Sequence, residues 1–188
     1  MSNALTINKV DDDFVIRFSV SNDKLDLRKI FNFTILDIVY AVNKDALLDD
    51  YECVVAPCGE KAALRLVFKH LFKDIGMPPF HLNMNMSLVS SSDPDKRVHL
   101  GVRVPTVGQS VHSNDKTRTA PTRTAPTCDA PITRLEMQCL FPSPGHATCE
   151  IRISLDEDQQ LLLPYEDIFI GIFKKMFKKV KGFIETLV

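Results

Sequence analysis

Few side chains in this sequence have the types and spacing that catalysis requires. Nucleophilic catalysis needs a serine or cysteine, a histidine and an orienting acid. Of the five histidines, only His81 and His99 fall where two expected strands would place them on one face of a hairpin. Asn83 and Asn85 share that face, and a solvated polar strip is the more ordinary explanation. We therefore predict that the protein is not an enzyme.

The cysteines do not form a recognisable metal site. Cys53 and Cys58 are separated by four residues, and His146 precedes Cys149, but the sequence has no C-x-x-C pair. The seven glycines form neither of the usual phosphate-binding motifs. We predict no metal and no cofactor. The sequence leaves open whether Cys139 and Cys149 ever form a disulfide.

Cysteine usage and the N-terminus also bear on the compartment. Five irregularly spaced cysteines favour reduced thiols. The first residues lack the basic and apolar regions of a signal peptide, and no stretch reaches the roughly 20 apolar residues that span a bilayer. The sequence thus predicts a cytoplasmic or nuclear protein without a transmembrane segment.

The segment from Pro164 to Val188 combines a strongly apolar face with a strongly basic one. At 100° per residue its apolar residues cover one side and its lysines the other. The apolar face includes Phe169, Phe173, Met176, Phe177, Val180, Phe183 and Ile184, and the basic patch comprises Lys174, Lys175, Lys178, Lys179 and Lys181. We predict a long helix that packs its phenylalanines on a sheet. A partner-protein groove, a membrane surface and a nucleic acid are the alternatives.

The elements that would position this helix come from hydrophobic periodicity. A short strand near residues 5–7 and a strand over 14–20 flank an acidic turn. Capping residues Ser21-Asn22-Asp23 predict a helix over 25–39, and apolar spacing predicts a second helix over 60–75. A short strand is expected at 51–55, between the two helices.

Two hairpins follow the second helix. Alternating residues predict strands at 82–88 and 98–104. In the next hairpin, a turn centred on Pro144 makes Met137 face Ile151 and Cys139 face Cys149. The same register places Glu136 opposite Arg152 on the other side, an opposite-charge pair that favours this alignment.

The residues between these hairpins interrupt the pattern. The range 105–131 is rich in Thr, Pro, Ser and Ala and repeats the pentapeptide Arg-Thr-Ala-Pro-Thr. It has too few large apolar residues to bury itself. We predict one domain over 1–188 with a flexible loop inserted at about 105–131.

Together these elements predict an α+β fold. Mostly antiparallel strands with one apolar face need a helical layer over that face. We expect a two-layer domain with a sheet of about six strands, in three hairpins, covered by helices that include the long amphipathic C-terminal helix. The order of strands, two helices, antiparallel strands and a final long helix resembles the helix-grip arrangement of START-like proteins.

The sequence has few residues suited to catalysis and predicts a compact scaffold. These features favour a non-enzymatic protein-binding or assembly subunit, viral or cellular. The tail of the chain supports this hypothesis. Residues 149–155, then Leu163-Pro-Tyr-Glu-Asp-Ile, then the lysine-rich helix are similar in outline to the end of alpha-like assembly subunits of multisubunit RNA polymerases. The resemblance covers about a fifth of the chain and implies another protein as partner.

Two alternatives belong to other classes. The first is a carrier that encloses an apolar small molecule between the sheet and the terminal helix. Its cargo would contact Met84, Met86, Met137, Phe169, Phe173 and Phe177. The second is a nucleic-acid binder that uses the lysine face, although the net charge of −1 gives no global attraction to a polyanion.

Overall fold

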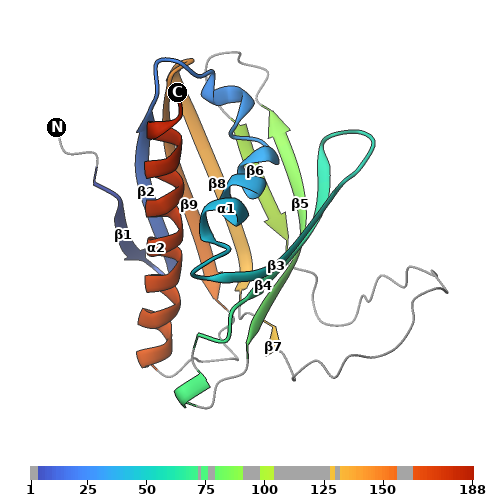
Figure 1. Ribbon diagram of the computed structural model, residues 1–188, viewed down its shortest axis with the longest axis vertical. Coiled ribbons are helices and arrows are strands. Elements are labelled where there is room, and N and C mark those ends of the chain that lie inside the picture. The colour runs from blue at the N-terminus through green and yellow to red at the C-terminus, as the bar shows by residue number, and fades with distance from the viewer. Residues whose placement is uncertain are drawn as a thin grey trace.

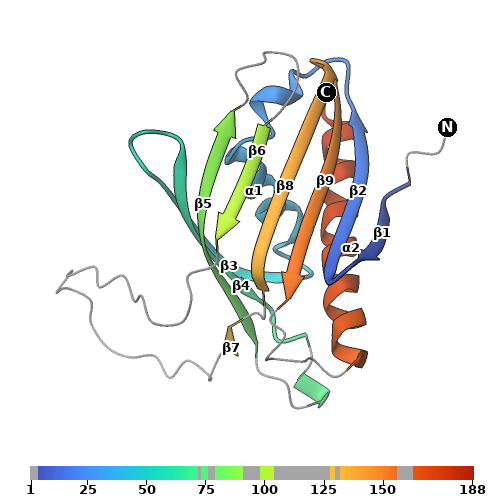
Figure 2. The same cartoon turned by 180° about the vertical axis from the view of Figure 1, so that it is seen from behind.

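The protein is built on one antiparallel sheet with two α-helices packed on one of its faces (Figures 1 and 2). The computed structural model describes residues 4–71, 73–75, 79–90, 98–103, 128–129, 132–155 and 163–188. Among these residues, no helix is both long enough and apolar enough to cross a bilayer.

The sheet has nine strands in the described residues. Its order is β1-β2-β9-β8-β6-β5-β4-β3, all antiparallel, and the short β7 pairs in parallel with β5. The second strand therefore pairs with the last one, which joins the two ends of the chain inside one sheet. The strands are β1 (Thr6–Val10), β2 (Asp13–Ser21), β3 (Leu48–Val55), β4 (Lys61–Phe68), β5 (Phe80–Ser90), β6 (Val98–Arg103), β7 (Cys128–Asp129), β8 (Ile132–Ser143) and β9 (His146–Leu155).

The helices cover the inner face of this sheet. Helix α1 (Thr34–Asn43) and the long helix α2 (Leu163–Thr186) contact each other, and α2 also contacts β2. Seen from behind, the sheet stands in front of both helices and its outer face is not covered by either of them (Figure 2). Two short 3-10 helices, η1 (Leu27–Lys29) and η2 (Lys73–Ile75), complete the described elements.

Alternation along the strands explains why one face is covered. In β2, Phe14, Ile16, Phe18 and Val20 are buried in the core, whereas Arg17 is exposed. A strand points successive side chains to opposite faces, so such a sheet has an apolar face that needs a cover. Helix α2 supplies it, with Phe173, Met176, Phe177, Val180 and Ile184 buried. The two-layer α+β prediction, with the terminal helix packed on the sheet, is confirmed.

The register predicted for the last hairpin is also confirmed. Met137 pairs with Ile151, Cys139 with Cys149, and Glu136 with Arg152. The turn forms at Pro144-Gly145, and the register shifts by one residue beside it, between Leu140 and Ser143. The hairpin of β5 and β6 is likewise found.

The predicted helix over 60–75 is wrong. Residues 61–68 form strand β4, in which Ala62, Leu64, Leu66 and Phe68 are buried and Lys61 and Arg65 are exposed. Both periods fit so short a segment, because Leu64, Phe68 and Leu71 also share one side of a helix. Pairing with β3 and β5 decided in favour of the strand, and the sheet consequently has more than the predicted six strands.

The predicted start of the first helix is wrong as well. Strand β2 continues to Ser21, η1 follows, and α1 begins only at Thr34. Asn22 makes hydrogen bonds to the other end of the molecule instead of capping a helix that follows it. Its Nδ2 donates to the carbonyl oxygens of Ile184 and Leu187, each at 2.8 Å, at the C-terminus of α2.

The inserted loop predicted at about 105–131 lies outside the described residues, except for β7 within it. The single-domain assignment for 1–188 stays a prediction.

Candidate functional site

A small apolar cavity lies between the helices and the sheet. Its volume is about 60 Å³, and all of its lining residues have apolar side chains. They come from α1, α2, β4, β5, β8 and β9, so the cavity exists only when both layers are assembled. The lining residues are Ile35, Leu36, Val39, Leu64, Leu66, Leu82, Met84, Met86, Leu135, Met137, Ile151, Phe173, Met176 and Phe177.

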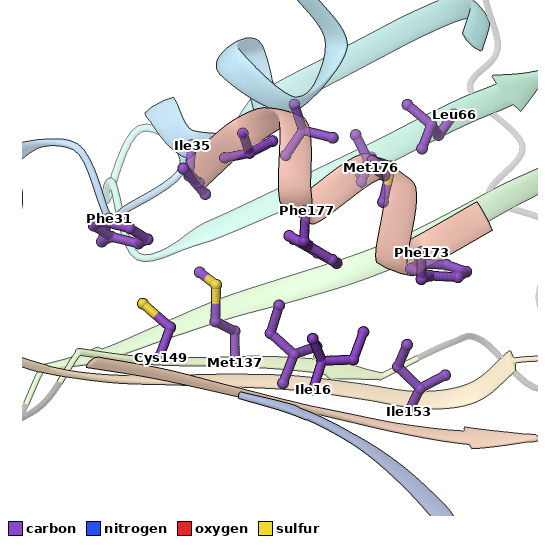
Figure 3. Packing of buried hydrophobic residues seen from close by; sticks show 14 of the residues in the cluster. Ile16, Phe31, Ile35, Leu66, Met137, Cys149, Ile153, Phe173, Met176 and Phe177 are labelled. Carbon is purple, nitrogen blue, oxygen red and sulfur yellow. The ribbon is translucent and has the colours of Figure 1, made fainter. Parts of the chain in front are cut away.

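Five of the six residues predicted for an apolar site surround this cavity. Met84 and Met86 lie on β5, Met137 on β8, and Phe173 and Phe177 on α2. The side chain of the sixth residue, Phe169, lies outside what the structure describes. Figure 3 shows Met137 on the sheet side of the core and Phe173 and Phe177 on the helix opposite.

Other lining residues were missed by sequence reasoning. Leu64 and Leu66 were assigned to a helix, so the alternation that places both of them on the inner face of β4 went unused. Ile35 and Val39 belong to α1, where they share one helix face and are buried. Their spacing is visible in the sequence, but the surface that they cover is not.

The lining restricts what the cavity can accept. A hydroxyl, amide or charge that enters an apolar site without a partner loses its hydrogen bonds to water, which is costly. The cavity is also smaller than the roughly 300–1,000 Å³ typical of ligand pockets. Its four methionines are unbranched and flexible, so their side chains can rearrange around an apolar guest.

Helix α2, which covers the cavity, is held differently at its two ends. At its C-terminus the Asn22 side chain donates to two carbonyl groups, and Lys181 Nζ donates to Ser19 O at 2.6 Å. Near its N-terminus, Glu166 accepts from Lys9 Nζ at 2.7 Å, an ion pair whose lysine is half exposed. Exposed ion pairs contribute little stability, so the N-terminal half of α2 has the weaker of these two attachments.

The predicted basic patch separates into two groups. Lys174, Lys175, Lys178 and Lys179 are exposed on the outer side of α2. Lys181 is instead largely covered, because it bonds to Ser19 and forms an ion pair with Glu185. Of the five lysines, four thus face outward and the fifth helps to attach the helix.

The thiols of Cys139 and Cys149 face each other on the inner side of the sheet. Their sulfur atoms are 3.1 Å apart, both residues are buried, and both are free cysteines. Burial away from water disfavours the thiolate and raises the pKa of Cys149 well above its ordinary value.

We predict that these two thiols react slowly in the native protein. Iodoacetamide should modify the exposed Cys58 first, because the reagent reacts with thiolates that it can reach. Peptide mass spectrometry measures the rate of modification at each cysteine. Cys139 and Cys149 should be modified only as the core opens, and at full rate in urea. Labelling of either one in native protein as fast as Cys58 would contradict the packing of β8 and β9 against α2.

His81 and His99, the two histidines expected to share a face, do not lie close together. His99 is paired with Val89, eight residues along β5 from His81. At about 3.3 Å per residue this separates the two backbones by roughly 26 Å. Among the described residues, no group of three His, Cys, Asp or Glu converges in a way that could hold a metal ion.

No protein-family profile matches this sequence, and neither does any curated protein. The human StarD13 (DLC2) lipid transfer and protein localization domain is similar in structure, with a TM-score of 0.62 at 10% identity, over 97% of this chain and 84% of that one. Human STARD10 gives a TM-score of 0.58 at 10% identity, over 94% of this chain and 72% of that one.

A third solved structure agrees with these two. Human StAR-related lipid transfer protein 5 gives a TM-score of 0.53 at 8% identity, over 96% of this chain and 84% of that chain. At such identities the likeness establishes the fold. The chain has the helix-grip fold that the sequence resembled, with one α-helix in place of the two expected before the later strands.

These neighbours overturn the assembly-subunit hypothesis. The outline shared with alpha-like RNA polymerase subunits covered a fifth of the chain, whereas the helix-grip likeness covers nearly all of it. A strand followed by an amphipathic helix is expected wherever a sheet needs a helical cover. The C-terminal pattern therefore does not distinguish one family of proteins from another. The interpretation as a protein-binding assembly subunit or adaptor was wrong, and a protein partner has no support from the comparison.

Proposed function

We propose that this protein is a carrier that encloses an apolar small molecule between the inner face of its sheet and helix α2. The observation that carries the proposal is the cavity, which lies between the two layers and has only apolar side chains around it. The fold is shared with domains that are named for lipid transfer. We expect binding and release without chemical conversion, and a cytoplasmic or nuclear location where thiols stay reduced.

The enclosed part of the cargo would be a hydrocarbon. Transfer of apolar surface out of water drives binding at about 25 cal/mol per Å², whereas a buried polar group would find no partner among the lining side chains. Any polar head of the cargo therefore stays at the mouth of the cavity or in solvent.

Binding requires the cavity to widen beyond its volume of about 60 Å³. Rearrangement of the methionine side chains supplies part of the space. Displacement of the N-terminal half of α2 supplies the rest, since its C-terminal half is fixed by Asn22 and Lys181. In this scheme α2 is the lid, and the region around Asn22 is where it pivots.

A cavity-filling substitution tests the proposal. Leu66 is buried on β4 and lines the cavity, so Leu66→Phe extends a ring into empty space. We expect binding of the apolar fluorophore diphenylhexatriene to weaken at least about tenfold, because the ring occupies space that the guest needs. The melting temperature should be unchanged or higher, since filling a void restores packing contacts.

The matched control is Leu140→Phe. Leu140 is 41% exposed and lines a groove on the outer side of the sheet with Arg17 and Glu150. The same change there should leave probe binding intact. Solvent extracts of the wild-type protein, purified from its native source, should contain an apolar compound by mass spectrometry. Absence of both a bound compound and probe binding, or equal loss in the two variants, would refute the carrier.

A further inference from the structure

The outer side of α2 carries a concentrated positive charge. Lys174, Lys175, Lys178 and Lys179 are exposed, and at 1.5 Å per residue they lie within about 8 Å along the helix axis. In the described part of the chain, none of these four lysines takes part in an ion pair. We call these four residues the lysine face.

The positive charge of the lysine face is opposite in sign to the net charge of the rest of the protein. The whole chain has a net charge of −1, so the residues outside the lysine face together carry a net negative charge. An anionic surface would attract α2 and repel much of the rest of the molecule. This uneven charge distribution would both attract the protein to an anionic surface and orient it with α2 toward that surface.

Two further features of the lysine face suit a lipid surface. Phe183 lies at its edge and is 39% exposed, whereas Phe173 and Phe177 are buried. Gly171 and Gly182 have open space where a side chain would stand. Because neither residue has a side chain, the backbone on this side of α2 can come close to a flat surface. Because the apolar face of α2 is buried on the sheet, its contact with a bilayer would be mainly electrostatic, with ammonium groups meeting lipid phosphates and only the ring of Phe183 entering the interface.

We propose that the lysine face docks the protein on an anionic membrane surface, with α2 lying against the lipid headgroups and parallel to them. The arrangement favours a membrane over a nucleic acid. The described part of α2 has no arginine, the residue that most often reads bases, and its four exposed lysines are confined to about 8 Å along the helix axis. Docking through α2 places the lid of the cavity against the membrane, where an apolar cargo would be collected or released.

The test is flotation of the full-length protein with vesicles. Wild-type protein should float with vesicles of phosphatidylcholine containing about one third phosphatidylserine, and not with phosphatidylcholine alone. Raising the ionic strength from about 0.05 to about 0.3 M should release it, because salt screens exposed charges. Each lysine near such a surface contributes about fivefold in affinity.

The decisive variant replaces all four lysines with glutamine, as Lys174→Gln, Lys175→Gln, Lys178→Gln and Lys179→Gln. Its binding to anionic vesicles should fall at least about fiftyfold, while circular dichroism shows an unchanged helix content. A control with the same loss of charge elsewhere, Lys24→Gln, Lys29→Gln, Lys44→Gln and Lys61→Gln, should float nearly as well as wild type. These control lysines are exposed and lie outside α2.

Three results would overturn the docking proposal. They are equal flotation with neutral and anionic vesicles, equal loss in the two quadruple variants, and a stronger affinity for RNA than for anionic vesicles at the same salt. Diphenylhexatriene binding is measured without vesicles. A protein that holds the probe but ignores anionic vesicles therefore remains a carrier and lacks the docking surface.

Discussion

Replacement of Phe173 by alanine is expected to lower the free energy of unfolding by about 3–5 kcal/mol, a large part of the total for a protein of this size. Phe173 is 1% exposed, and its ring contacts Phe68 on β4 and Phe177 on α2, with centroid distances of 6.5 and 6.4 Å. Removing the ring takes away buried apolar surface and leaves a void between helix and sheet. Urea unfolding followed by circular dichroism measures the loss, because the sequence has no tryptophan.

Phe183→Ala is the matched control on the same helix. Phe183 is 39% exposed, so its truncation should cost less than about 1 kcal/mol. Phe173→Ala also enlarges the cavity that Phe173 lines, and we expect the folded variant to bind diphenylhexatriene at least as well as wild type. Equal destabilisation by the two substitutions would mean that α2 does not bury the face assigned to it.

Asn22→Asp should destabilise the protein by about 3–5 kcal/mol at neutral pH, because it removes two donors and leaves a carboxylate facing carbonyl oxygens. Asn22 is 7% exposed, and its Nδ2 group is the donor to Ile184 O and Leu187 O. These carbonyls belong to the C-terminus of α2, where the helix dipole also disfavours negative charge. Hydrogen exchange of the last turns of α2 should accelerate in parallel.

The effect of Asn22→Asp should depend on pH in a defined direction. Burial and the neighbouring carbonyls raise the pKa of the new carboxyl in the folded state above the unfolded value of about 3.9. The penalty is therefore complete above the folded pKa. It decreases as the pH falls toward about 4, because the protonated carboxyl is neutral and can donate one hydrogen bond.

Two comparisons complete this test. Asn22→Ala, which leaves the carbonyls unpaired but adds no charge, should cost about 1–3 kcal/mol with little dependence on pH. Asn85→Asp, on an exposed position of β5, should change stability by less than about 0.5 kcal/mol. The Asn22→Asp variant could instead be as stable as wild type, or lose the same stability at pH 4 and pH 7. Either result would mean that the Asn22 side chain does not hold the C-terminus of α2.

The pattern of apolar residues along the sequence predicted some elements of this fold correctly and assigned others to the wrong type. The register of β8 and β9 follows from facing pairs alone, since Met137 opposite Ile151 and Glu136 opposite Arg152 are consistent with only one alignment. Residues 61–68 show the limit of such reasoning. Leu64, Leu66 and Phe68 fit a strand, Leu64 and Phe68 also fit a helix, and only the neighbours β3 and β5 distinguish the two.

The candidate site was predictable to the same degree. Met84, Met86, Met137, Phe173 and Phe177 were expected to line an apolar space because each lies on the apolar face of its own element. The contribution of α1 through Ile35 and Val39 was not predicted, because a helix pattern does not say which surface the helix covers. The hydrogen bonds of Asn22 to α2 span more than 160 residues, and no local signal marks them.

The sequence by itself determined that this is an α+β protein with an antiparallel sheet, a long amphipathic helix to cover it, and an apolar face on that helix opposite a lysine face. Those properties follow from periodicity, which acts between residues close along the chain. Only the tertiary structure decided that residues 61–68 are a strand, that Asn22 anchors the end of α2, and that a cavity remains between the layers. Each of these depends on pairing or packing between segments far apart in sequence, and such contacts form only when the whole core is assembled.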